Sequence, residues 1–176
     1  MEYCQEFNKF RLERGQWTDD TAMGLCVADS LIMRRGFDGS DMRTRFWCWW
    51  FRGYNNAFRL DSARCSRASI GLGGNVKNSL EGLEAEQDAE GRVPPIYEVE
   101  NEDAGNGSIM RLAPVPLLLA AAPLEELYRV ARLSSYTTHP GGVAAEACAL
   151  LAHLVARALA RPPGPPDAKA FLCRET

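Results

Sequence analysis

The sequence lacks the cysteine spacings that mark disulfide frameworks and zinc sites. Its 176 residues include six cysteines, and no two of them form a C-x-x-C pair. Cys26 and Cys148 lie within apolar helical runs, where cysteine packs as a small hydrophobic residue. We therefore expect reduced thiols and a cytoplasmic location.

Long uninterrupted apolar runs are also missing. The most apolar stretches are broken by prolines or by charged and polar residues, namely Pro114, Pro116, Pro123, Glu146, His153 and Arg157. The first residues, MEYCQEFNKFRLERG, contain no apolar segment of the kind found in a signal peptide. We expect neither a signal peptide nor a membrane span.

An excess of basic charge is absent as well. The net charge is −3, and no aromatic residues are interleaved with a basic stripe, as binding of single-stranded nucleic acid requires. Nucleic acid is therefore not an expected partner. Residues 81–103 are strongly acidic, which favours a solvated connection.

No segment alternates apolar and polar residues as a strand does, whereas several segments show helical spacing. The clearest are residues 18–35, a tryptophan-rich segment after residue 37, a helix after a glycine-rich turn at 71–74, and residues 124–133 and 141–161. The pattern predicts an all-α, multi-helical bundle over residues 1–161. Residues 162–176 are predicted to be a mobile tail whose prolines forbid helix.

Three clusters of polar residues stand where helices are expected to begin. In the first, WTDDT, a cap explains Thr18 and one acidic residue. It explains two less well, because consecutive helical residues point about 100° apart. Thr18, Asp19 and Asp20 together offer three oxygen ligands to a hard ion such as Mg²⁺, so both interpretations stay open.

The second cluster is AGNGSIMR, in which Gly105, Asn106, Gly107 and Ser108 precede a helix. Exposed backbone N–H groups in such a turn bind phosphate, but an ordinary tight turn has the same composition. The third cluster, SSYTTHPGG, places His139 just before the last long helix. His153 lies inside that apolar helix and is interpreted as structural. In a bundle, all three clusters can converge at one end.

These three motifs, in this order, resemble those of the ADP-ribosylglycohydrolase family. The resemblance implies an all-α fold, two bound Mg²⁺ ions (or Mn²⁺), and removal of ADP-ribose from modified side chains or small conjugates. It implies metal binding by Thr18, Asp19 and Asp20. It also implies substrate contacts from Gly105, Asn106, Gly107, Ser108 and His139, with Met110 and Arg111 in the same loop motif.

The sequence also departs from the family pattern. The amino-terminal glycine-rich helix with its G-D and glutamate is not found, nor is the D-x-D-T motif that completes the metal site, so the bundle is expected to be incomplete at both ends. Asp61 is only a doubtful counterpart of the aspartate in the family's F-D-I-G-x-T segment, and no catalytic residue is assigned. Two hypotheses remain: a metal-dependent hydrolase fragment with weak or no activity, and a non-catalytic relative resembling a lens crystallin.

Overall fold

The computed structural model describes residues 9–84, 87–100, 105–162, 164 and 167–175. Cys4 and three prolines of the tail, at positions 163, 165 and 166, lie outside these residues. The described residues form seven helices and no strand, which confirms the predicted all-α class. The helices are α1 (Asp19–Arg34), α2 (Gly39–Arg52), α3 (Gly74–Leu80), α4 (Pro114–Leu118), α5 (Leu124–Tyr136), α6 (Gly142–Leu159) and α7 (Ala168–Glu175).

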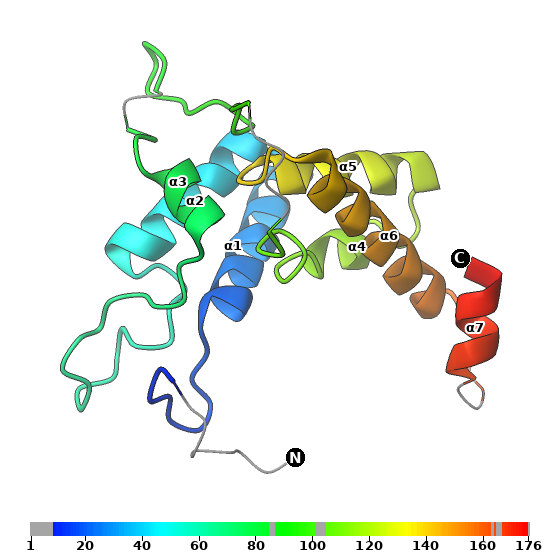
Figure 1. Cartoon of the computed structure of the whole chain (residues 1–176), viewed down its shortest axis with the longest axis horizontal. Coiled ribbons are helices and arrows are strands. Elements are labelled where there is room, and N and C mark those ends of the chain that lie inside the picture. The colour runs from blue at the N-terminus through cyan, green and yellow to red at the C-terminus, as the bar shows by residue number, and fades with distance from the viewer. Residues whose placement is uncertain (1–8, 85–86, 101–104, 163, 165–166, 176) are drawn as a thin grey trace.

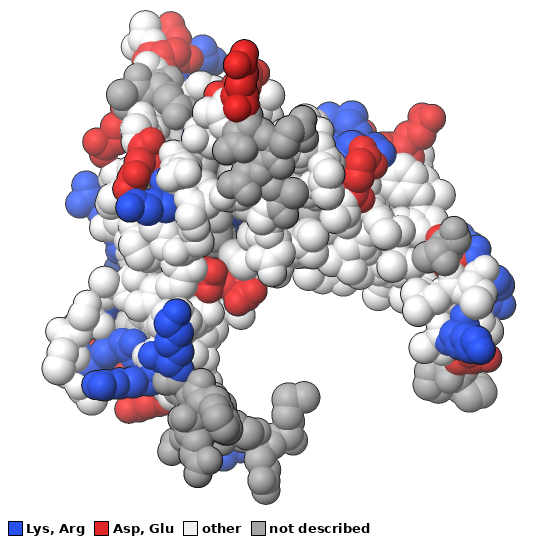
Figure 2. Space-filling model, viewed as in Figure 1, with Lys and Arg blue, Asp and Glu red and all other residues white. Residues whose placement is uncertain are grey.

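The helices form two groups that α4 joins. α1 packs against α2, α5 packs against α6, and α4 contacts α1, α5 and α6. Figure 1 shows the first pair on one side of the molecule and α5 with α6 on the other, with α7 at the far end. Figure 2 shows that the surface over α4 to α6 is mostly uncharged on this face.

α1 forms because its apolar residues recur at helical spacing and bury one face. Met23 and Cys26 are inaccessible to solvent, and Val27 and Leu31 lie beside them. The helix ends where Arg35 adopts a left-handed conformation, and the N–H groups of Arg35 and Gly36 donate to the carbonyls of Ile32 and Leu31. Its first turn therefore projects from a firmly packed element.

The tryptophan-rich segment is predicted to pack on the core, and the structure confirms this. Asp38 caps the start of α2, because its carboxylate accepts a hydrogen bond from the Asp41 N–H at 2.9 Å. Phe46 and Trp49 on this helix are buried against α1. The aromatic residues thus contribute burial energy to the core.

A buried arginine on α2 holds the acidic connection against the helix. The Arg43 guanidinium donates to the carbonyls of Pro94 at 2.9 Å and Ile96 at 3.0 Å. The approach is close enough that a Cβ on Gly39 would meet the Pro95 carbonyl oxygen. Most side chains of residues 87–100 are nevertheless exposed, as the sequence predicts.

α6 is long and apolar enough to cross a membrane by length and composition alone. The core helix of a soluble protein passes the same test. α6 packs against α5 and α4, and it buries Ala145, Cys148 and Ala152 completely. The expected absence of a membrane span stays a prediction.

The expectation of no helix after Pro162 is wrong, because α7 covers Ala168–Glu175. The prolines end at position 166, and the carboxylate of Asp167 accepts a hydrogen bond from the Ala170 N–H at 2.9 Å. A new helix can therefore begin with its own cap. Mobility of residues 162–176 stays a prediction.

Glu175 links α7 to α6. Its carboxylate lies 2.7 Å from Arg157 Nε and 3.3 Å from His153 Nε2. His153 in turn lies 2.7 Å from the Tyr128 hydroxyl through Nδ1. His153, predicted to be structural, thus joins α5, α6 and α7.

We expect Glu175→Gln to increase amide exchange of residues 168–175, because it removes the ionic link to Arg157. The hydrogen bond from Arg157 holds the pKa of Glu175 below its usual 4.5. The link is therefore complete above about pH 4.5 and is lost as the pH falls through the lowered folded pKa. Glu146→Gln, which breaks the Arg132–Glu146 pair between α5 and α6, is the matched control. Unchanged exchange of α7 in Glu175→Gln would contradict this role.

Candidate functional site

A small pocket of about 190 Å³ lies where four segments of the chain meet. These are the start of α1, the start of α3, the loop after residue 104, and the loop between α5 and α6. The pocket is lined by Asp19, Gly73, Gly74, Asn75, Val76, Gly105, Asn106, Gly107, Met110 and His139. Residues from all three predicted clusters therefore meet in one place.

Asp19 is the carboxylate of this pocket. Thr18 occupies the N-cap position of α1 but makes no side-chain capping bond. Burial raises the pKa of Asp19, a hydrogen bond with Thr18 opposes this rise, and the Asp20 carboxylate adds to it. No ion pair with Asp19 exists among the described residues, although a half-buried carboxylate is stabilised by a cation.

Asp20 lies close to Asp19 but is exposed and does not line the pocket. Successive residues of a helix point about 100° apart, so the first turn of α1 directs only one of the two side chains inward. The sequence motif alone treats the two aspartates as equivalent. In the structure, Asp19 lines the pocket and Asp20 lies outside it.

Glycine is required at Gly71 by both backbone conformation and packing. Its φ of +93° lies in a region that other residues rarely adopt. A Cβ built on Gly71 would lie within contact distance of Asp19, overlapping its carboxylate oxygen. The glycine-rich turn before α3 thus approaches Asp19 through bare backbone.

Two glycines of the G-N-G-S loop make room for polar side chains. A Cβ on Gly107 would lie 2.9 Å from His139 Cε1, and one on Gly105 would lie 2.8 Å from Asn75 Nδ2. Between these glycines, Asn106 is exposed at the pocket. The loop therefore packs against both His139 and Asn75.

Ser108 and Arg111 lie behind the pocket and do not line it. Ser108 is buried and accepts a hydrogen bond from the Ser135 hydroxyl at 2.9 Å. Arg111 is 2% exposed and donates to Ser134 O, Thr137 Oγ1 and Thr138 Oγ1. Burial lowers the pKa of Arg111 to about 10, so it stays protonated at neutral pH. Both residues hold the loop in place, and a direct substrate contact from either stays a prediction.

Asn75 belongs to the pocket but was missed by sequence reasoning. It stands at the start of α3, and its Nδ2 atom is buried without a hydrogen-bond partner among the residues that the structure describes. An unpaired buried amide costs about 1–3 kcal/mol, and a ligand that accepts its hydrogen bond would remove this cost. The signal in the sequence was a polar residue directly after the glycine-rich turn GLGG.

The family model for ADP-ribosylglycohydrolase matches residues 2–174, which is nearly the whole chain. The chain belongs to the ADP-ribosylglycohydrolase family. The resemblance seen in the three motifs is thereby confirmed, and so is the all-α fold that it implies.

The chain is also similar to several curated members of the family. It is 33% identical over 144 residues to the ADP-ribosylarginine hydrolase Tri1 of Pseudomonas putida (strain GB-1), covering 81% of this chain and 35% of that protein. It is 29% identical over 146 residues to the Tri1 protein of Serratia proteamaculans (strain 568), covering 83% and 36%. It is 31% identical over 130 residues to the ADP-ribosylhydrolase ARH3 of Gallus gallus, covering 73% and 31%. The chain thus spans about a third of the length of these relatives.

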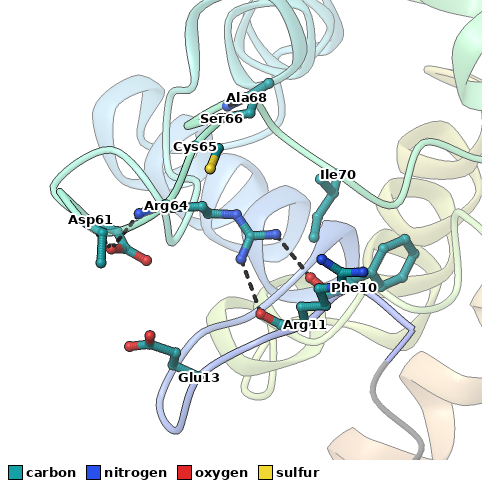
Figure 3. A pocket seen from close by; sticks show the side chains of 10 residues that line it. Phe10, Arg11, Glu13, Asp61, Arg64, Cys65, Ser66, Ala68 and Ile70 are labelled. Carbon is teal, nitrogen blue, oxygen red and sulfur yellow. Dashed lines mark hydrogen bonds between the residues drawn. The ribbon is translucent and has the colours of Figure 1, made fainter.

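Asp61, the doubtful counterpart of a family aspartate, lies in a different and larger pocket of about 360 Å³. Figure 3 shows Asp61 in this pocket with Arg64, whose guanidinium points at the backbone carbonyls of Phe10 and Arg11. The Asp61 carboxylate accepts hydrogen bonds from the Gln16 side chain and from the backbone N–H groups of residues 63 and 64. Asp61 therefore orders a loop and does not reach the candidate site.

The residues at the candidate site provide only part of the ligand shell of one hard metal ion. Thr18, Asp19 and Asp20 offer a hydroxyl and two carboxylates, which are ligands that Mg²⁺ accepts when water completes its shell. No group of three His, Cys, Asp or Glu side chains able to hold a metal occurs in the part of the chain that the structure describes. The donor set suits a single weakly held ion better than the ion pair implied by the family.

We expect Gly71→Ala to destabilise the protein more than Gly82→Ala does. Both glycines have a φ of +93°, so both substitutions carry a similar backbone cost of about 1–2 kcal/mol. Only the Cβ at position 71 has a neighbour within 4 Å, and that neighbour is Asp19. The difference in the free energy of unfolding, measured by urea denaturation, isolates the contact with Asp19. Equal losses in the two variants would show that Asp19 is not held against the turn.

Proposed function

We propose that this chain carries the ribose-binding part of a metal-dependent ADP-ribosyl hydrolase, with weak or no turnover by itself. The observation that supports this most is the convergence of Asp19, Asn75, Asn106 and His139 in one pocket, from segments far apart in the sequence. Family membership supplies the reaction class. The substrates in view are ADP-ribosylated arginine side chains, because two relatives are named as ADP-ribosylarginine hydrolases.

The pocket suits the terminal ribose of ADP-ribose rather than the whole molecule. Its volume of about 190 Å³ is below the roughly 300–1,000 Å³ of complete ligand sites. A sugar ring presents hydroxyl groups, which both donate and accept hydrogen bonds. The amides of Asn75 and Asn106 and the imidazole of His139 match these groups.

A bound Mg²⁺ or Mn²⁺ would be held mainly by Asp19, which lines the pocket, with Thr18 and the exposed Asp20 as weaker ligands from the same turn of α1. Such an ion would supply orientation of the ribose hydroxyls and polarisation of water. The chain's own residues would contribute orientation. Asp19 lines the pocket from α1, while His139 and Asn75 line it beside the glycine loop. Cleavage of a ribosyl bond develops positive charge on the sugar, which a nearby carboxylate stabilises.

Low activity is proposed because the pocket has only one lining carboxylate among its described residues. General acid–base catalysis at a glycosidic bond normally uses two such groups. Tight binding of a metal ion also needs more fixed ligands than Thr18, Asp19 and Asp20 provide. We further propose that the protein is cytoplasmic and that neither nucleic acid nor a membrane is a partner.

The single carboxylate at the pocket also favours a second candidate function. This is a non-catalytic member of the family that binds ADP-ribose or keeps the bundle as a structural protein. With a single carboxylate at the pocket wall, recognition of a ribose does not depend on hydrolysis. The two candidates differ in whether Asp19 is required for turnover or only for binding.

The test is release of ADP-ribose from an ADP-ribosylated arginine peptide in the presence of Mg²⁺, with the full-length Tri1 protein of Pseudomonas putida as the positive control. We expect the chain to be slower than this relative by orders of magnitude, because its donor set suits only one weakly held metal ion and the described residues that line the pocket include one carboxylate. Any residual turnover should disappear on addition of a chelator, in Asp19→Ala and in Asp20→Ala. Asp61→Asn, a change in the other pocket, should leave it unaltered.

Each outcome assigns one of the candidates. Residual turnover that depends on Asp19 supports the hydrolase. No turnover, together with measurable ADP-ribose binding, supports the non-catalytic candidate. Turnover as fast as that of the full-length relative would contradict the proposed incompleteness of the site. Turnover that Asp19→Ala leaves unchanged would show that this pocket is not the active site.

A further inference from the structure

A chain of hydrogen bonds runs from the buried interior to the wall of the pocket. Arg111 Nη2 donates to Thr138 Oγ1 at 2.6 Å, and Thr138 Oγ1 lies 2.7 Å from His139 Nδ1. All three residues are at most 2% exposed, so water does not compete for these bonds. The far side of the imidazole, with Cε1 and Nε2, lies against Gly105 and Gly107 at the pocket.

The partners of Thr138 determine where its hydroxyl proton goes. The Arg111 guanidinium is only a donor, so Thr138 Oγ1 accepts that bond. The remaining neighbour within hydrogen-bond distance, among the described residues, is His139 Nδ1. If Nδ1 carried a proton, the Thr138 hydroxyl would face two donors and its own proton would be buried without an acceptor, which costs about 1–3 kcal/mol. The hydroxyl therefore donates to Nδ1.

We propose that Thr138, held by Arg111, fixes His139 in the tautomer protonated at Nε2, so that the histidine presents an N–H donor to the pocket. Thr138 and Arg111 are then positioning residues. This inference rests on the proposed function for its ligand: His139 donates to an acceptor oxygen of the bound ribose. In this state Nε2 has no lone pair, so His139 recognises an oxygen and does not act as a general base.

The neighbouring Thr137 provides a matched comparison within the same structure. Its hydroxyl is equally buried and also accepts a hydrogen bond from Arg111 Nη2, at 3.1 Å. It donates its one proton to the Ser134 carbonyl at 2.6 Å, so it has none to donate to His139. Thr137→Val therefore removes a buried hydroxyl beside Arg111 without touching the imidazole.

The experiment is ¹⁵N NMR of the imidazole rings, recorded at about pH 8.5, above the usual histidine pKa of about 6.5. The chain has only two histidines, so His153→Gln assigns both rings. We expect wild-type His139 to carry its proton on Nε2 alone. Thr138→Val should produce a population protonated at Nδ1, whereas Thr138→Ser, which keeps the hydroxyl, and Thr137→Val should retain the wild-type pattern.

Binding of ADP-ribose, measured by calorimetry with Mg²⁺ present, gives the second readout. Thr138→Val should weaken binding about three- to tenfold, the value of one hydrogen bond, and Thr138→Ser should restore it. A proton on Nδ1 in wild-type His139 would overturn the inference. An unaltered Nε2 tautomer in Thr138→Val would overturn it too, because the hydroxyl would then not be the cause.

The two proposals fail in different ways. The NMR result needs no ligand, so it judges the role of Thr138 even if wild-type protein does not bind ADP-ribose. Absence of binding in wild-type protein would count against the proposed function alone. Equal ADP-ribose affinity in Thr138→Val and wild type would remove the claim that the His139 donor contacts the ligand.

Discussion

The candidate site depends on the buried guanidinium of Arg111. A buried cation needs acceptors, and none of the carboxylates in the described residues forms an ion pair with it. Its hydrogen bonds go instead to the end of α5 and the following threonines, while its face stacks over the Phe46 ring of α2 at 4.4 Å. One side chain thus ties the loop after residue 104 to α2 and to the segment that carries His139.

Three glycines, Gly71, Gly105 and Gly107, allow the backbone to pack directly against the polar side chains of the pocket. Where the glycine-rich turn meets Asp19, and where the G-N-G-S loop meets Asn75 and His139, a Cβ would overlap the polar side chain. The polar groups are therefore packed against backbone and keep little freedom, which is the condition for a pre-organised binding site. Rigid placement of these groups suits recognition of a sugar whether or not the chain completes a metal centre.

Sequence reasoning was sufficient for the elements that have strong periodicity. The start of the first helix at Asp19, the buried aromatic residues of α2 and the apolar last long helix follow from residue spacing and capping. α7 was missed because prolines dominate the composition there, although Asp167 provides a new cap. The motifs also placed Arg111 and Asn106 in one class, since a motif does not distinguish a side chain behind a pocket from one that lines it. That distinction depends on tertiary packing, as does the unpaired amide of Asn75.

The central claim is that this pocket, and not the larger one beside Asp61, receives the ribose of ADP-ribose. The most direct measurement is a titration of ¹⁵N-labelled chain with ADP-ribose and Mg²⁺, followed by backbone amide chemical shifts. We expect the largest changes to fall on residues 73–76, on residues 105–107 and on His139. Changes confined to residues 61–70, or no changes at saturating ADP-ribose, would contradict it.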